Sequence, residues 1–325
     1  MGMLVNGKWS TEWYKPDSKG RFQRPETRFH DRVTADGSSG FKAEAGRYHL
    51  YVSLACPWAH RTTIMRKLKN LEDAISISVV DYFMGDDGWV FTERSGATPD
   101  TVNKKKFLRD IYLLADPDYT GRVTVPVLWD KKEQTIVNNE SREILRMLDT
   151  EFDAIGDASV TFAPAELRDK IDETLTAIYE PINNGVYRSG FATTQEAYDE
   201  AVTQLFDALD HWDQVLGSQR FLCGNVLTEA DWCLFATLVR FDPVYVGHFK
   251  CNLRRIVDYP NLWNFVKELY QIPGIADTCN FDHIKRHYYE SHETINPTRI
   301  VPKGPIIDYS APHDRDRLPR RGFAF

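Results

Sequence analysis

The sequence of 325 residues lacks a long apolar run, a surplus of basic residues and a C-x-x-C pair. A membrane-spanning helix needs roughly 18 or more consecutive apolar residues, and no run approaches that length. The N-terminal stretch has no apolar core of a signal peptide and already carries Glu12 and Asp17. The formal net charge of −7 argues against a surface that wraps nucleic acid or binds an anionic membrane. We therefore expect a cytoplasmic protein that binds neither nucleic acid nor membrane.

Cysteine is also scarce, and its spacing excludes two common uses. The five cysteines are an odd number, and no pair has the spacing of a zinc site or of a dithiol enzyme. We therefore expect free thiols, a reducing compartment and no bound metal. The four cysteines after Cys56 lie in or near helical and loop segments, where we expect inert thiols. These four are Cys223, Cys233, Cys251 and Cys279.

The first half of the chain has the element order of a thioredoxin-like domain. Residues 1–40 are polar, broken by glycine and proline and without a steady period, which indicates an extended N-terminal arm. The expected order β-α-β-loop-β-β-α then fills residues 41–152, and its strand–helix–strand unit predicts a parallel pair with a right-handed crossover. Strands are expected at 47–54, 74–81, 123–130 and 134–137, helices at 58–70 and 140–149, and a helix inside the long polar connection at 103–114.

From about residue 150 the apolar residues recur with the helical period of about 3.6. Residues 160–325 are therefore expected to form an all-helical domain with a C-terminal extension, of which 314–325 would be a loose tail. Thr228 and Asp231 have the spacing of a capping box, which predicts a helix start. The expected helices are 164–179, 194–216, 229–241 and 262–271.

Cys56 is the strongest chemical signal in the sequence. It follows the strand at 47–54 and precedes Pro57, which suits the first position of a helix. Unpaired N–H groups and the dipole at a helix N-terminus stabilise a thiolate, so we expect a thiol pKa below the free value of about 8.5. His60 and Arg61 follow within one turn and add positive potential. An ordinary buried thiol is the alternative, and the position before proline at a strand-to-helix turn argues against it.

The residue that would complete a dithiol pair with Cys56 is Ala59. A monothiol enzyme must take a thiol from solution to resolve a mixed disulfide, and glutathione is the obvious donor in a reducing cytosol.

Two further motifs suit a small peptide ligand. A cis-proline at Pro126 would leave the Val125 backbone free to pair with the peptide, whereas an edge-strand proline without a ligand role is the alternative. Glu140 and Ser141 open a helix and can hold the ammonium and the carboxylate of a γ-glutamyl group. Simple capping of the helix is the alternative for this pair.

Together these residues resemble the glutathione transferase superfamily, and Cys56-Pro-Trp-Ala resembles its cysteine-containing classes. Three longer stretches are similar to the glutathionyl-hydroquinone reductases, the xi class of that superfamily. The resemblance runs from Trp9 to Pro305. It implies a glutathione transferase fold, with an α/β thioredoxin-like N-terminal domain and an all-α C-terminal domain, in a homodimer. The three stretches are 84–91, 184–198 and 282–305.

The resemblance also implies glutathione as co-substrate and assigns the site residues. The catalytic cysteine corresponds to Cys56 and a glutathione-binding tryptophan to Trp89. The tyrosines that face the hydroquinone correspond to Tyr187 and Tyr289, with Tyr288 as the alternative to Tyr289. The remaining glutathione contacts correspond to Arg122, Val125, Pro126, Glu140 and Ser141.

The implied reaction is a two-step exchange at Cys56. The thiolate attacks the sulfur of a glutathionyl-hydroquinone, the hydroquinone leaves, and a second glutathione releases glutathione disulfide. Tyrosine hydroxyls would stabilise charge on the ring oxygens. Three nearby histidines are expected to be structural or surface residues, with help in proton transfer as the alternative, namely His283, His287 and His292.

Two other functions stay open at this point. An omega-like thioltransferase or dehydroascorbate reductase would use the same cysteine, but it has no need of an aromatic hydroquinone pocket. A non-catalytic adaptor with a transferase-like fold is the second, because a fold does not determine a function. The intact set of Cys56, Val125-Pro126, Glu140 and Ser141 argues against the adaptor.

Overall fold

The computed structural model describes residues 2–322, which divide into two compact units. The first unit contains the chain up to Trp13, Arg24–Ser159 and Asn280–His292. The second contains Tyr14–Gln23, Val160–Cys279 and the chain from Glu293 on. The helix at 281–291 thus groups with the thioredoxin-like unit, although we expected all of 160–325 in the helical domain.

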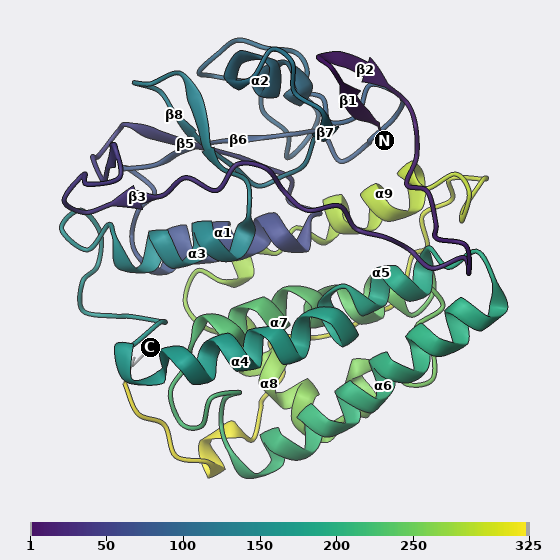
Figure 1. Ribbon diagram of the computed structural model, residues 1–325. Coiled ribbons are helices and arrows are strands. Elements are labelled where there is room, and N and C mark those ends of the chain that lie inside the picture. The colour runs from purple at the N-terminus through teal and green to yellow at the C-terminus, as the bar shows by residue number, and fades with distance from the viewer. Residues whose placement is uncertain (1, 323–325) are drawn as a thin grey trace. The chain divides into compact units, whose positions relative to one another are not determined.

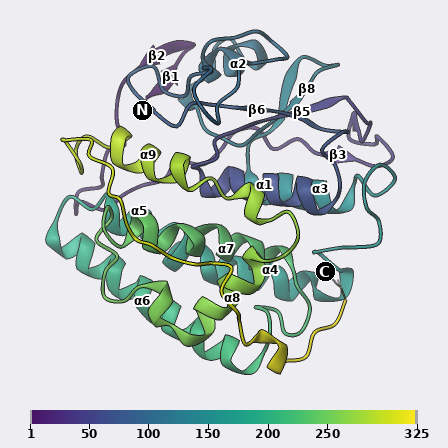
Figure 2. The ribbon, with the colours of Figure 1, turned by 180° about the vertical axis from the view of Figure 1, so that it is seen from behind.

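The first unit is built on a four-stranded mixed sheet in the order β6-β5-β8-β9. The central strand β5 is buried along its whole length, pairs in parallel with β6 and antiparallel with β8, and β8 pairs antiparallel with β9. Helices α1 and α3 lie side by side on one face of this sheet, and α2 lies on the other side (Figure 1, Figure 2). The bounds are β5 Tyr48–Val52, β6 Ser76–Val79, β8 Val127–Asp130, β9 Thr135–Asn138, α1 Pro57–Leu68, α2 Leu108–Ala115 and α3 Ser141–Thr150. The predicted thioredoxin-like order is confirmed.

The N-terminal arm is more regular than its sequence indicates. Strand β1 pairs antiparallel with β2 and with β7, and the short strands β3 and β4 pair in parallel. Such short strands carry too few residues to show an alternating pattern, which is why the sequence did not indicate them. The bounds are β1 Met3–Val5, β2 Lys8–Ser10, β3 Val33–Thr34, β4 Phe41–Lys42 and β7 Gly121–Arg122.

The second unit is helical, as predicted. Its core helix α7 is buried at every position, and the capping box of Thr228 and Asp231 at its start is confirmed. The helices are α4 Arg168–Ile178, α5 Gly185–Gly190, α6 Gln195–Ser218, α7 Glu229–Arg240 and α8 Pro260–Tyr270. Short 3-10 or π segments are η1 Ala165–Leu167, η2 Tyr179–Asn183, η3 Phe241–Tyr245, η4 Ile256–Asp258, η5 Ala276–Thr278 and η6 Arg315–Arg317.

Two helices were not predicted from the sequence, and the reasons are physical. Helix α5 has six residues with a glycine at each end, too short for a period to show. Helix α9, Phe281–Ser291, buries His283, Ile284, His287 and Tyr288, so half of its buried stripe is polar and the apolar period is hidden.

The C-terminal segment up to residue 322 is not a loose tail. Arg315 is fully buried and donates to the main-chain oxygens of Leu216, Gln219 and Arg220, close to the end of α6. A guanidinium satisfies several carbonyls at once because it carries five donors. The rest of the predicted tail, 323–325, lies outside the described residues.

Candidate active site

Cys56 occupies the N-cap of α1, as the sequence predicts. Its backbone is extended, with φ −74° and ψ 123°, and Pro57 follows as the first helical residue. The thiol is half-buried, and its Sγ lies 3.6 Å from the main-chain oxygen of Val125. The nucleophile candidate therefore sits where the helix dipole favours a negative charge.

The peptide bond between Val125 and Pro126 is cis, as predicted. Pairing of β8 with β5 begins only at Val127. Within residues 2–322, neither the N–H nor the carbonyl of Val125 makes a hydrogen bond to another backbone group. An extended peptide placed here would find a free main-chain edge beside the Cys56 sulfur.

Glu140 and Ser141 form the N-terminus of α3. Glu140 is the N-cap, and its Oε1 accepts hydrogen bonds from the Arg142 N–H at 3.2 Å and the Ser141 hydroxyl at 3.4 Å. Ser141 Oγ in turn accepts from Arg61 Nη1 at 3.2 Å. The carboxylate, the hydroxyl and the N–H groups of a helix start thus meet at one place, which suits a zwitterionic γ-glutamyl group.

Arg61 gives this corner a buried positive charge. The side chain is 1% exposed, and its guanidinium lies 4.4 Å from the centre of the Trp58 ring. Among residues 2–322, its Nε has no hydrogen-bond partner, and it forms no ion pair with an acidic side chain. A buried guanidinium without a carboxylate is costly, so an anionic ligand group nearby would be stabilised. From the sequence, Arg61 was expected only to add positive potential near Cys56.

Trp89 lies in the long connection between β6 and α2, and it is nearly buried at 6% exposure. The connection is fixed by main-chain bonds, from Leu108 N–H to the Trp89 oxygen at 3.0 Å and from Phe91 N–H to the Lys106 oxygen at 2.9 Å. The Trp89 ring stacks on His287 of α9, with centroids 4.9 Å apart and planes at 24°. No pattern in the sequence indicated this contact.

Arg122 lies on β7, where its Nη1 donates to the main-chain oxygen of Glu12 in the N-terminal arm. The N-terminal arm and strand β7 are therefore joined at this residue. The structure brings Arg122 into the same unit as Cys56, Trp89 and the start of α3.

The candidate tyrosines differ in their surroundings. Tyr288 is 1% exposed, and its ring packs against His287 at 5.3 Å and His292 at 5.6 Å, whereas the neighbouring Tyr289 is half-buried. Both lie on α9 in the first unit. Tyr187 lies on α5 in the second unit, half-buried, with its ring 5.4 Å from Phe249.

The other cysteines have the character expected of inert thiols. Burial raises the pKa of Cys223 and of Cys251, and it raises the pKa of Cys279 to about 12. A thiol with a raised pKa carries little thiolate at neutral pH, so these groups are poor nucleophiles. Cys233 is fully buried in α7.

No helix within residues 2–322 is both long and apolar enough to span a membrane. No group of three or more histidine, cysteine, aspartate or glutamate side chains there is arranged to hold a metal ion.

Comparison with known proteins identifies the family. The N-terminal and C-terminal domain models of glutathione S-transferase match residues 55–151 and 195–268. The chain is 57% identical over 324 residues to glutathionyl-hydroquinone reductase YqjG of Escherichia coli (strain K12). This alignment covers 97% of this chain and 99% of that protein.

Solved structures agree with the sequence relatives. The structure of a xi class transferase from Natrialba magadii superposes with a TM-score of 0.94 at 55% identity, covering 99% of this chain and 98% of that one. The glutathione-bound structure of YqjG gives a TM-score of 0.89 at 55% identity over 96% of this chain and 99% of that one. The resemblance drawn from the sequence is thereby confirmed, and the chain belongs to the xi class of the glutathione transferase family, the glutathionyl-hydroquinone reductases.

Proposed function

We propose that this chain reduces glutathionyl-hydroquinones to hydroquinones with glutathione, through a mixed disulfide on Cys56. The observation that carries the proposal is the placement of a single thiol at the N-cap of α1, with its sulfur against the Val125 carbonyl beside cis-Pro126. The name of the E. coli relative supports the same reaction.

The reaction balances in two exchange steps. The Cys56 thiolate attacks the sulfur of the conjugate, the bond from sulfur to the ring carbon breaks, and the ring takes a proton to become the hydroquinone. The thiolate of a second glutathione then attacks the glutathione sulfur of the mixed disulfide and releases Cys56. One conjugate and one glutathione thus give one hydroquinone and one glutathione disulfide.

The hard part of the first step is the departure of a ring carbon. It becomes feasible if the ring enters as its keto tautomer, because the electrons of the broken bond then end on an oxygen. We propose that Tyr187 and a hydroxyl of the Tyr288–Tyr289 pair, with Tyr289 favoured, hydrogen-bond the ring oxygens and stabilise this charge. Tyr288→Phe and Tyr289→Phe, compared by kcat, identify which member of the pair acts.

Glutathione is held by the features at the start of α3 and beside β8. The main chain of Val125 pairs with its cysteinyl residue, Glu140 takes its ammonium, and Ser141 takes its α-carboxylate with Arg61 behind the hydroxyl. Trp89 and Arg122 are proposed as the other contacts.

A product assay tests the function. Purified protein and Cys56→Ser receive a glutathionyl-hydroquinone and excess glutathione, and chromatography follows the products. Hydroquinone and glutathione disulfide from the wild type alone support the proposal. Reduction of dehydroascorbate or of a mixed disulfide, without release of hydroquinone, identifies an omega-like activity instead. A Cys56 that alkylates at pH 6 no faster than a free thiol, with no turnover of either substrate class, points to an adaptor.

We also propose a homodimer in the cytoplasm. The family membership supports the dimer, and five free cysteines support a reducing compartment. Light scattering of the purified chain at micromolar concentration tests the dimer. The expected molar mass is twice that of one chain.

A further inference from the structure

Helix α9 bonds the two ends of the loop that carries Trp89. His283 and His287 approach main-chain oxygens of this loop, with His283 Nε2 2.7 Å from that of Ser95 and His287 Nδ1 2.8 Å from that of Tyr82. The Ser291 hydroxyl accepts from the Met84 N–H at 3.0 Å. The three side chains are spaced four residues apart, so they lie on one face of α9.

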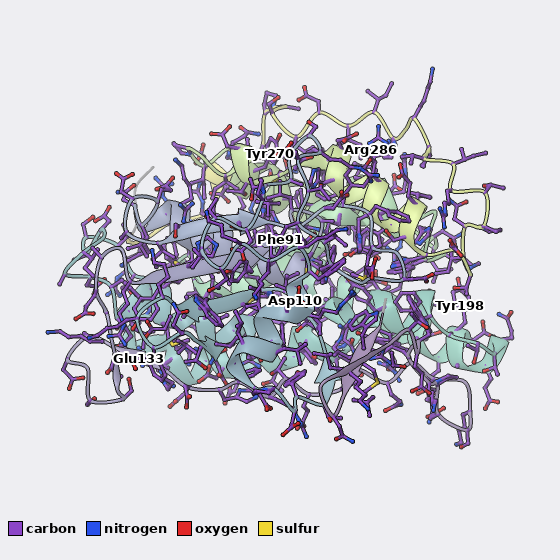
Figure 3. The ribbon with its side chains drawn as sticks, turned by 90° about the horizontal axis from the view of Figure 1, so that it is seen from above. Phe91, Asp110, Glu133, Tyr198, Tyr270 and Arg286 are labelled. Atoms are coloured by element: carbon purple, nitrogen blue, oxygen red, sulfur yellow. The ribbon has the colours of Figure 1, made fainter. Side chains whose placement is uncertain are left out.

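The same face of α9 also touches the loop through rings. His287 stacks on Trp89 at 4.9 Å, and Tyr82 contacts His283 at 5.4 Å and the Arg286 guanidinium at 5.4 Å. Figure 3 labels Phe91 in the loop and Arg286 on the helix. Each histidine therefore joins one loop carbonyl and one loop ring.

A glycine gives α9 the room for this approach. Gly96 has a φ of +83°, and a Cβ there would lie 2.3 Å from His283 Nε2. Gly96 thus provides both the backbone conformation and the space that this histidine needs. An incidental contact of a C-terminal helix would need no such accommodation.

We propose that α9 is a clamp that holds the loop Tyr82–Ser95 in its glutathione-binding shape, and that His287 is the positioning residue for Trp89. The proposal rests on the proposed function, because it takes Trp89 as a glutathione contact. The three histidines were expected to be structural or surface residues, and the geometry gives two of them a role in ligand affinity.

The clamp has a kinetic consequence that a general stabilising role does not have. A loop without its anchors populates the binding shape for only a fraction of the time, and the apparent dissociation constant rises by the inverse of that fraction. Saturating glutathione restores the bound shape. A broken clamp therefore raises KM for glutathione and leaves kcat nearly unchanged.

Two substitutions separate the two contacts of His287. His287→Asn keeps an N–H that can reach the Tyr82 carbonyl and removes the ring, whereas His287→Phe keeps a ring against Trp89 and removes the donor. Ser291→Ala removes only the anchor of Met84, and it carries the test if the buried position 287 does not tolerate change. The matched control is Glu293→Gln, an exposed site just after α9 whose carboxylate pairs with Arg299, outside the loop.

Each variant is assayed for hydroquinone release against glutathione concentration. For His287→Phe we expect KM to rise about tenfold, the change that loss of one buried hydrogen bond gives, with kcat within twofold. His287→Asn should recover part of this loss and Ser291→Ala should show a smaller rise, while Glu293→Gln matches the wild type. Trp89→Ala serves as the reference and measures how much the tryptophan itself contributes to KM for glutathione.

Calorimetric titration with glutathione in a Cys56→Ser background repeats the comparison without turnover. If the wild type releases no hydroquinone, the proposed function fails, and this titration still decides the clamp. A KM and a dissociation constant within twofold of the wild type in the variants at 287 and 291, beside a clear loss in Trp89→Ala, overturn the clamp. A loss of kcat at unchanged KM overturns it as well.

Discussion

Asp231→Ala is predicted to destabilise the helical unit much more than removal of an ordinary capping residue. The Asp231 side chain is fully buried at the start of α7. Its Oδ1 accepts the Leu222 N–H at 2.8 Å, and its Oδ2 accepts the Thr228 N–H at 2.8 Å and the Thr228 hydroxyl at 2.9 Å. Alanine would leave two main-chain donors buried without partners.

The size of the effect follows from those two donors. A buried donor left without a partner costs about 1–3 kcal/mol, so two of them cost roughly 2–6 kcal/mol, and we expect about 4 kcal/mol. An ordinary N-terminal cap is worth about 1 kcal/mol, because water replaces the lost bond. For a unit of this size, 4 kcal/mol corresponds to a fall in Tm of about 10 °C.

The matched control is Asp258→Ala. Asp258 occupies the same capping-box position at η4 and accepts the Arg255 N–H at 3.1 Å, but it is exposed to solvent. Urea unfolding of both variants, followed by circular dichroism, measures the two losses. A loss below about 1 kcal/mol in Asp231→Ala, or equal losses in both variants, would refute the role assigned to burial.

Two further predictions concern the glutathione site and pH. Arg61→Met removes the charge-assisted hydrogen bond to Ser141, which is worth about 1.5–3 kcal/mol. KM for glutathione should therefore rise tenfold or more while the fold is kept. An unchanged KM contradicts the role of the buried charge. Burial lowers the pKa of His30, but hydrogen bonds to Thr27 and Glu143 outweigh it and raise the pKa above its ordinary value of about 6.5. The stabilisation by protonated His30 is therefore complete below about pH 6.5 and is lost as the pH rises through the raised pKa. The difference in unfolding free energy between the wild type and His30→Gln should shrink between about pH 6 and pH 9. A difference that stays constant over this range contradicts the assignment.

The elements with strong local signals were predictable from the sequence. Strand β5 and helix α1 meet at Cys56-Pro57, where the period changes from two to 3.6 and proline marks the first helical residue. The capping box of Thr228 is a comparable signal at α7. In each case the residues that mark the element lie within it or next to it, so a short window of sequence contains the signal.

The candidate site was predictable to a smaller extent. Cys56, Pro126 and Ser141 stand at element boundaries, where position alone indicates chemistry. Trp89 was identified only through the family resemblance, because its loop has no period. Arg61 was underrated, because one helix cannot show that the partner of its guanidinium lies on another helix, 80 residues along the chain.

The clamp by α9 shows why such contacts leave no trace in one sequence. Its three bonds join residues 188, 205 and 207 positions apart. To these three bonds the loop contributes only main-chain groups. Since nearly every residue carries an N–H and a carbonyl, no side-chain pattern marks the ones that are used. On the helix the donors are histidines, which make α9 read as polar rather than buried. One signal could have indicated this contact. It is a row of side chains, spaced four residues apart, that can hydrogen-bond the main chain, in a sequence that also has a long loop with several glycines.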